Sequence, residues 1–142
     1  MVATRVEGVQ IERMADEILA LKEGSLEAHA INQSAAVVYD LCDGNTSKSE
    51  IAAEIHRRTG LPADEEIVDL ALSELVETGL VLLDDPEPRS AVSRRALIRR
   101  LALSSTLALM LPVVETIAVP PAEGVVLMSP HRFAPTPTPI FN

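Results

Sequence analysis

The chain has 142 residues and a formal net charge of −9, with 21 acidic and 12 basic side chains. The charge is divided unevenly, because residues 1–88 hold 19 acids and 6 bases whereas residues 89–142 hold 2 acids and 6 bases. A nucleic-acid binder needs a basic face to neutralise phosphates, so the acidic first part argues against that class. The sequence therefore predicts an acidic domain with a basic, apolar tail and no nucleic acid among its partners.

The chain has one cysteine, Cys42, so it forms no intramolecular disulfide, which favours a reducing compartment. Residues 1–8 lack the apolar stretch of a secretory signal. We therefore expect a cytoplasmic protein, with membrane association through the C-terminal tail as an additional prospect.

Three short strands are predicted at residues 9–14, 17–22 and 26–31. The first and third alternate apolar and polar side chains, which is the period of a half-buried strand. Turn sequences lie between the strands, at residues 15–17 and at Gly24-Ser25. Such closely connected strands predict an antiparallel meander.

The helices predicted next are residues 33–42, residues 48–59 and a third from near Pro62 to Gly79. Asn32 is the expected N-cap of the first helix, since its side chain can accept from free amides of the first turn. Ser47 and Glu50 have the spacing of a capping box at the start of the second. A short apolar strand or extended segment follows at residues 80–83.

Residues 31–44 read Ile-Asn-Gln-Ser-Ala-Ala-Val-Val-Tyr-Asp-Leu-Cys-Asp-Gly. This stretch resembles the pattern Leu-Asn-x-Thr-Ala-Ala-x-Ile-Trp-x-Leu-x-Asp-Gly of the PqqD family, the pyrroloquinoline-quinone biosynthesis protein D-like proteins. Residues 49–55 and 72–81 fit the family as well, so the resemblance covers about residues 8–85. Tyr39 stands where the family commonly has Trp.

The resemblance implies an α+β fold: a winged-helix-like domain with a three-stranded meander followed by three helices, here extended by a C-terminal helical, apolar tail. Proteins of this family, also called RiPP recognition elements, are non-catalytic. They bind the leader of a ribosomally made precursor peptide and present it to a modifying enzyme, often a radical SAM enzyme. In the family the leader adds as a strand beside the third strand, in a groove walled by the third helix.

The peptide-binding residues predicted on this basis are Leu26, Glu27, Ala28, His29, Ala30, Ile31, Ile67 and Leu70. An exposed third strand offers free backbone groups to an extended peptide. Ile67 and Leu70 extend an apolar arc wider than one packing face requires; the alternative is that both pack on the hairpin. For Glu27 and His29 the alternative is a solvated strand face. We expect one of the amides of Ala28 and Ala30 to face the open edge.

Other kinds of site find little support in the sequence. The three histidines are far apart and no Cys-x-x-Cys spacing occurs, so we expect no metal. Cys42 lies on the apolar side of the first helix and is predicted to be a buried structural thiol. We expect no cofactor and no enzyme activity. The alternative functions are a winged-helix DNA-binding regulator, which the acidic charge disfavours, and a membrane-tethered adapter.

The C-terminal part is divided into a linker at residues 86–92, a basic, apolar helix at 93–119 and a Pro-rich, disordered end at 120–142. Residues 93–98, Ser-Arg-Arg-Ala-Leu-Ile, resemble a twin-arginine export signal but lie far from the N-terminus. The uncharged run of residues 101–114 would span about 21 Å as a helix, short of the roughly 30 Å hydrocarbon core.

We expect the helix at residues 93–119 to attach to a membrane or a partner rather than to the core of the acidic domain. The predicted contact residues are Arg94, Arg95, Arg99 and Arg100. The alternative is that the helix packs on a partner or back on the domain. A chain that ends at Pro88 is expected to fold and to bind its peptide.

Overall fold

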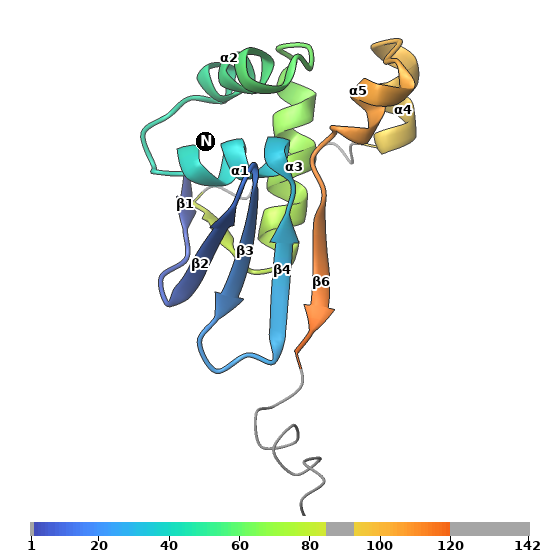
Figure 1. Ribbon diagram of the computed structural model, residues 1–142. Helices are drawn as coiled ribbons and strands as arrows, with labels where there is room; N and C mark the ends of the chain where they lie inside the picture. Colours follow the sequence, from blue (N-terminus) through green and yellow to red (C-terminus); the bar gives the residue numbers. More distant parts are fainter. Residues whose placement is uncertain (1, 85–92, 120–142) are drawn as a thin grey trace, which may run out of the picture.

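The computed structural model describes residues 2–84 and 93–119 (Figure 1). Its strands are β1 (Ala3–Arg5), β2 (Val9–Met14), β3 (Glu17–Lys22), β4 (Glu27–Ile31), β5 (Val81–Leu83) and β6 (Val114–Ala118). Its helices are α1 (Gln33–Leu41), α2 (Lys48–Thr59), α3 (Glu65–Glu77), α4 (Arg94–Arg100) and α5 (Ser105–Leu109).

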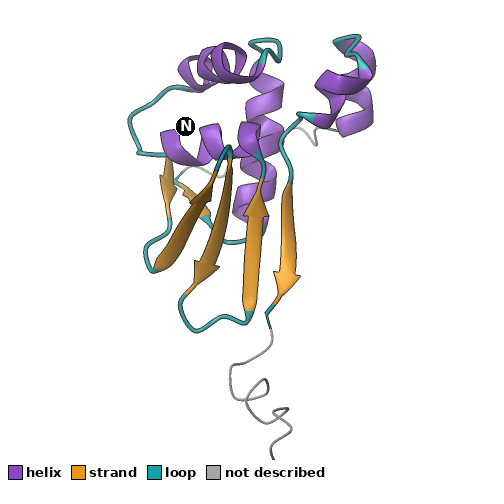
Figure 2. Cartoon of the chain, in the orientation of Figure 1, coloured by secondary structure: helices purple, strands orange, loops and turns teal. Residues whose placement is uncertain are grey.

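The main sheet has four antiparallel strands in the order β2-β3-β4-β6. Helix α3 lies behind this sheet, and α1 and α2 lie at one end of it (Figures 1 and 2). A second, two-stranded sheet is formed by β1 and β5. The meander of β2, β3 and β4 followed by three helices confirms the predicted α+β, winged-helix-like fold.

One face of the meander packs into the core. Ile18 and Ala20 of β3 are buried, and they pair in register with Ile31 and His29 of β4, which are buried on the same face. Side chains alternate between the two faces of a strand, so the residues between them lie on the outer face. The outer face is the side of the sheet turned away from α3 (Figure 1).

Helices α1 and α2 begin where the sequence predicts caps, whereas α3 begins at Glu65, three residues after Pro62. The Asn32 side chain accepts from the amide of Ala35 at the start of α1. Ser47 and Glu50 form the capping box of α2, which ends at Gly60 in the left-handed conformation. These caps satisfy amides that have no partner within the helix.

The fold begins before the predicted boundary at residue 8. Strand β1 pairs with β5, and the Arg5 amide also donates to the Cys42 carbonyl at 3.1 Å. Three residues are too short to show an alternating pattern, which is why β1 escapes prediction from sequence.

The prediction of one helix at residues 93–119 is wrong, because this segment forms α4, α5 and β6. Ala102 has a φ of 48° and ends α4, and Ser104 then caps α5 by accepting from the Leu107 amide. Pro112 has no backbone N–H and does not continue a helix. The β-branched residues that follow it favour a strand.

The tail also packs on the acidic domain, contrary to the expectation that it avoids the core. Leu97 of α4 and Leu111 are both buried within the main hydrophobic core. In the parts of the chain that the structure describes, no helix is long and apolar enough to cross a membrane. The predicted linker at 86–92 and the Pro-rich end at 120–142 lie outside the described residues.

Candidate peptide-binding edge

Strand β4 is the centre of the candidate site. One edge pairs with β3 and the other with β6, which comes from the C-terminal part of the chain. The β4–β6 register joins Glu27 to Ala118 and Ile31 to Val114. The edge predicted to receive an extended peptide thus receives an extended segment of the same chain.

The hydrogen bonds at the two ends of this ladder show which β4 groups face β6. The Asn32 amide donates to the Val113 carbonyl at 3.2 Å, and the Val119 amide donates to the Leu26 carbonyl at 2.6 Å. Backbone groups of alternate residues point to the same edge in an antiparallel pair. The amides of Ala28 and Ala30 therefore both face β6, and the expectation that only one of them does so is wrong.

His29 lies on the inner face of β4 and is 3% exposed. Its Nδ1 is 3.0 Å from the hydroxyl oxygen of Thr116, the residue opposite it on β6. Burial lowers the pKa of His29, Lys22 acts in the same direction and Glu27 opposes it. The solvated-face alternative is therefore excluded for His29, whereas Glu27 is exposed.

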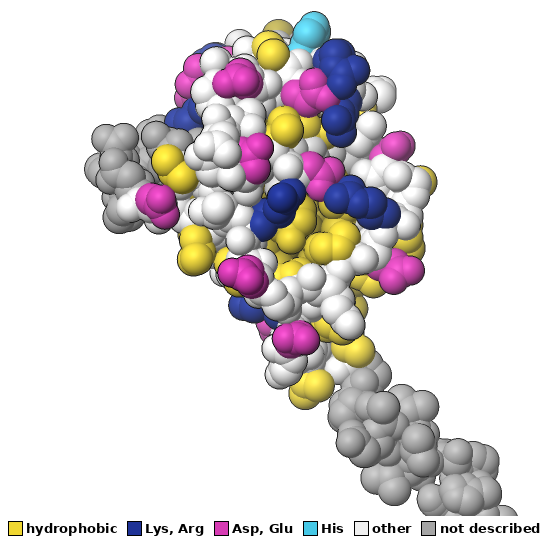
Figure 3. Space-filling view, turned by 90° about the vertical axis from the view of Figure 1, so that its left-hand side faces the viewer, with side chains coloured by type: hydrophobic (Ala, Val, Ile, Leu, Met, Phe, Trp, Pro, Cys, Tyr) yellow, Lys and Arg dark blue, Asp and Glu magenta, His cyan; other side chains and the backbone are white. Residues whose placement is uncertain are grey.

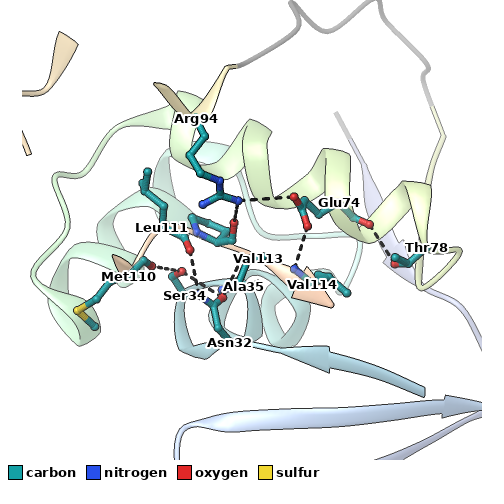
Figure 4. A network of polar contacts seen from close by, with 11 residues as sticks. Asn32, Ser34, Ala35, Glu74, Thr78, Arg94, Met110, Leu111, Val113 and Val114 are labelled. Carbon is teal, nitrogen blue, oxygen red and sulfur yellow. Dashed lines mark hydrogen bonds and ion pairs between the residues drawn. The ribbon is translucent and has the colours of Figure 1, made fainter. Parts of the chain in front are cut away.

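Asn32 joins the end of β4 to the tail (Figure 4). Besides capping α1, its Oδ1 accepts from the Val113 amide at 3.0 Å, and its Nδ2 donates to the Leu111 carbonyl at 2.9 Å. The buried Ser34 hydroxyl donates to the Met110 carbonyl at 2.5 Å. These bonds act on backbone groups of residues 110–113, so they do not depend on particular side chains of the tail.

Glu74 of α3 also contacts the tail (Figure 4). Its Oε2 accepts from the Val114 amide at 2.8 Å, and its Oε1 lies 3.6 Å from Nη2 of Arg94. The same Arg94 nitrogen donates to the Pro112 carbonyl at 2.6 Å. One carboxylate thus contacts both the beginning of β6 and the beginning of α4.

The acidic start of α3 holds the other end of α4. Nη2 of Arg100 lies 3.1 Å from Asp64 Oδ1 and 2.5 Å from Glu66 Oε1. Hydrogen bonding to Arg100 lowers the pKa of the Asp64 carboxyl. Helix α4 therefore runs antiparallel to α3, with the buried Leu97 between its two paired arginines.

The four predicted arginines divide into two kinds. Arg94 and Arg100 pair with α3, whereas the exposed Arg95 and Arg99 have no acidic partner within 4 Å among the described residues. The two pairs lie on opposite faces of α4. Arg94 and Arg100 face the domain, and Arg95 and Arg99 face solvent.

The structure places the remaining predicted residues as follows. Leu26 is 59% exposed and lies just before β4, where its carbonyl accepts from the tail. Ala28 and Ala30 lie on the outer face of β4, and Ile31 on its inner face. Ile67 is fully buried and Leu70 is 7% exposed, both within the main core. Neither offers free apolar surface in the structure.

Sequence reasoning missed the second role of Asn32, the role of Glu74 and the whole of β6. Asn32 was detectable only as a helix cap, because its other partners are about 80 residues away. For β6 a signal was present, since residues 113–117 are rich in β-branched side chains.

The described residues include no group of three or more His, Cys, Asp or Glu side chains that could hold a metal ion. Burial raises the pKa of Cys42 to about 12, so its thiol stays protonated at neutral pH, as predicted for a structural residue.

The fold and the site define a small winged-helix-like α+β domain with an extended segment added at one edge of its sheet. The family model described as Coenzyme PQQ synthesis protein D (PqqD) matches residues 11–81. The chain therefore belongs to the PqqD family. Neither the curated proteins nor the solved structures give a match to this chain.

Membership of this family implies a peptide-binding, accessory part in the biosynthesis of ribosomally made, modified peptides. The family's proteins are non-catalytic and act together with modifying enzymes.

Proposed function

We propose that residues 2–84 bind the leader of a ribosomally synthesised precursor peptide by strand addition to β4 and present it to a modifying enzyme. The observation that carries this proposal is the edge of β4, which pairs over five residues with an extended segment. Exposed sheet edges bind extended peptides through main-chain hydrogen bonds, while neighbouring side chains add specificity.

Three features equip this edge for a peptide. The amides of Ala28 and Ala30 face it and give a sequence-independent ladder. Asn32 and Glu74 add bonds to backbone groups of the incoming segment from the two sides of the groove. The acidic side chains of α3 favour a leader that carries basic residues. The modifying enzyme, for which a radical SAM enzyme is our candidate, would then act on the part of the precursor beyond the leader.

The protein itself supplies no catalytic group in this proposal. We place this step in the cytoplasm, because a lone, buried Cys42 suits a reducing compartment.

The net negative charge of the domain argues against the DNA-binding alternative. Residues 1–88 carry 13 more acids than bases, and the field of such a domain repels phosphates. On the face shown in Figure 3, acidic and basic side chains are interspersed, without a continuous basic band. Titration with labelled duplex DNA at low salt is expected to show no tight, salt-sensitive binding.

The test is a titration with a labelled leader peptide, taken from candidate precursor genes that are sought next to the gene of this protein. The protein carries a protease site within residues 86–92 and is cut before the titration, so that the tail remains present but can exchange. We expect saturable binding that Ala28→Pro and Ala30→Pro each weaken by tenfold or more, because proline removes a donor that faces the edge.

Ile11→Pro is the matched control. The Glu23 amide donates to the Gly8 carbonyl, so by alternation the Ile11 amide points away from β3 at the opposite edge of the same sheet. Proline is tolerated at such an edge position. A leader that binds all of these variants equally well would exclude strand addition at β4.

A further inference from the structure

The tail contacts the domain in the way a docked peptide does. Strand β6 lies on the β4 edge, residues 110–113 are bonded to Asn32 and Ser34, and α4 lies along α3. Each of these elements belongs to the groove in which the PqqD-type site is proposed to bind a leader.

We infer that residues 93–119 are a ligand that the chain carries for its own peptide site. This inference rests on the proposed function, and it adds both the occupant of the site and the class of peptide that fits. The domain and its ligand are then one molecule, and a separate leader binds only by displacing the tail.

The boundary of the family match supports a division into domain and ligand. The match ends at residue 81, so every element of the tail lies beyond it. Of the buried apolar residues in the main core, only Leu97 and Leu111 come from the tail among the described residues. The rest of the core belongs to residues 3–81.

Charge complementarity also supports the inference that the tail is a ligand of the domain. Residues 93–119 contain four arginines and one acid, Glu115, and they pair with a domain that carries a large excess of acids. Arg94 and Arg100 contact Glu74, Asp64 and Glu66 at the two ends of one face of α3. Opposite charges steer association and fix the register of the partners.

The sequence and the structure of the tail also indicate which class of peptide the site accepts. It begins with a short helix in which two arginines flank a buried leucine, Arg94, Leu97 and Arg100. A second buried leucine, Leu111, precedes an extended strand with a hydroxyl side chain, Thr116, opposite His29. A basic, apolar helix followed by a β-strand is therefore the recognised class.

Covalent attachment gives this ligand a large advantage over a separate peptide. A short linker produces an effective concentration of about 1 mM, so a tail with an intrinsic Kd of about 1 µM weakens the apparent affinity of a competitor by about 10³-fold. Cutting the linker removes this advantage without changing any described contact.

The test compares uncut and cut protein, using the protease site within residues 86–92. The probe is a fluorescent synthetic peptide of residues 93–119. We expect the cut tail to co-elute with the domain at micromolar concentration, and the probe to bind cut protein about 10³-fold more tightly than uncut protein. Circular dichroism of cut protein saturated with probe is expected to match that of uncut protein.

Two variant probes with the same change in charge provide the control. Arg94→Glu with Arg100→Glu reverses the residues that contact α3 and is expected to weaken binding by about tenfold or more. Arg95→Glu with Arg99→Glu reverses the solvent-facing residues and is expected to bind several-fold more tightly than the first variant. Equal binding of the two variants would contradict the docking geometry of α4.

The remaining outcomes separate this inference from the proposed function. If the probe fails to bind cut protein but the neighbouring leader binds, the inference is overturned and the proposed function stands. If the probe binds but that leader does not bind the cut protein at all, the proposed function fails and only the docking of the tail on β4 remains. If the leader binds without displacing the probe, the two peptides occupy different surfaces and the inference is overturned. If the cut tail never exchanges and its removal unfolds residues 2–84, the tail is part of the core and the inference is overturned.

Discussion

Leu111 and Leu109 offer a direct comparison, because they lie two residues apart in the tail and differ sharply in burial. Leu111 is 0% exposed and belongs to the main core, whereas Leu109 is 83% exposed. Truncation of a buried leucine to alanine removes transfer free energy and leaves a cavity, at a cost of about 2–5 kcal/mol. Truncation of an exposed leucine usually changes stability by less than about 0.5 kcal/mol.

The assay is urea denaturation of the full chain followed by circular dichroism. With a urea m-value of about 2 kcal/mol per M, Leu111→Ala lowers the midpoint by about 1–2.5 M, and Leu109→Ala leaves it within about 0.25 M. Equal midpoints for the two variants would refute the packing of the tail on the domain.

Two further predictions concern residues at the junction of β4 and the tail. Asn32→Ala is expected to lower the free energy of unfolding by about 2–3 kcal/mol, because it removes the cap of α1 and the bonds to Leu111 and Val113. Asn32→Asp keeps the acceptor oxygen, so it is expected to lower the free energy of unfolding by about half as much in the same urea assay. Burial lowers the pKa of His29, so below about pH 6.5 the unfolded chain takes up a proton that the folded chain does not, and stability falls as the pH drops. The urea midpoint is therefore expected to decrease from pH 7.5 to pH 5.5, and to decrease less in His29→Gln; an identical decrease in both proteins would argue against this role of His29.

The meander and the three helices could be predicted from sequence because their signals are local. Alternation defined β2 and β4, and Asn32, Ser47 and Gly60 marked helix ends within a few residues of the positions they cap. These signals depend only on neighbouring residues along the chain, so they do not require knowledge of the tertiary structure.

The tail could not be placed in this way, because its structure depends on a distant partner. Residues 114–118 become a strand by pairing with β4, which lies more than 80 residues earlier. Their apolar character was equally compatible with a membrane-attached helix, and only the docking on β4 decides between the two. The same docking brings the buried Leu97 into the core, with α4 held at α3 by Arg94 and Arg100.

The sequence predicts the site as the edge of a strand, but it does not predict that β6 of the same chain occupies this edge. The family resemblance singles out residues 26–31, and residues 27–31 of this stretch form β4, the strand that β6 joins. Glu74 carried no signal as a site residue, since a carboxylate on a helix is ordinarily solvated. Its contact with the Val114 amide exists only because the tail, paired with β4, brings Val114 to α3.

Amide hydrogen exchange of cut protein tests the central claim most directly, because it locates the peptide on the β4 edge. The leader peptide is added in excess to displace the tail, and the amides of Ala28 and Ala30 are followed by NMR. We predict that both amides stay protected when the leader has replaced the tail, and that the Ile11 amide at the opposite edge is unaffected. A leader that binds and displaces the tail while Ala28 and Ala30 exchange freely would contradict the account.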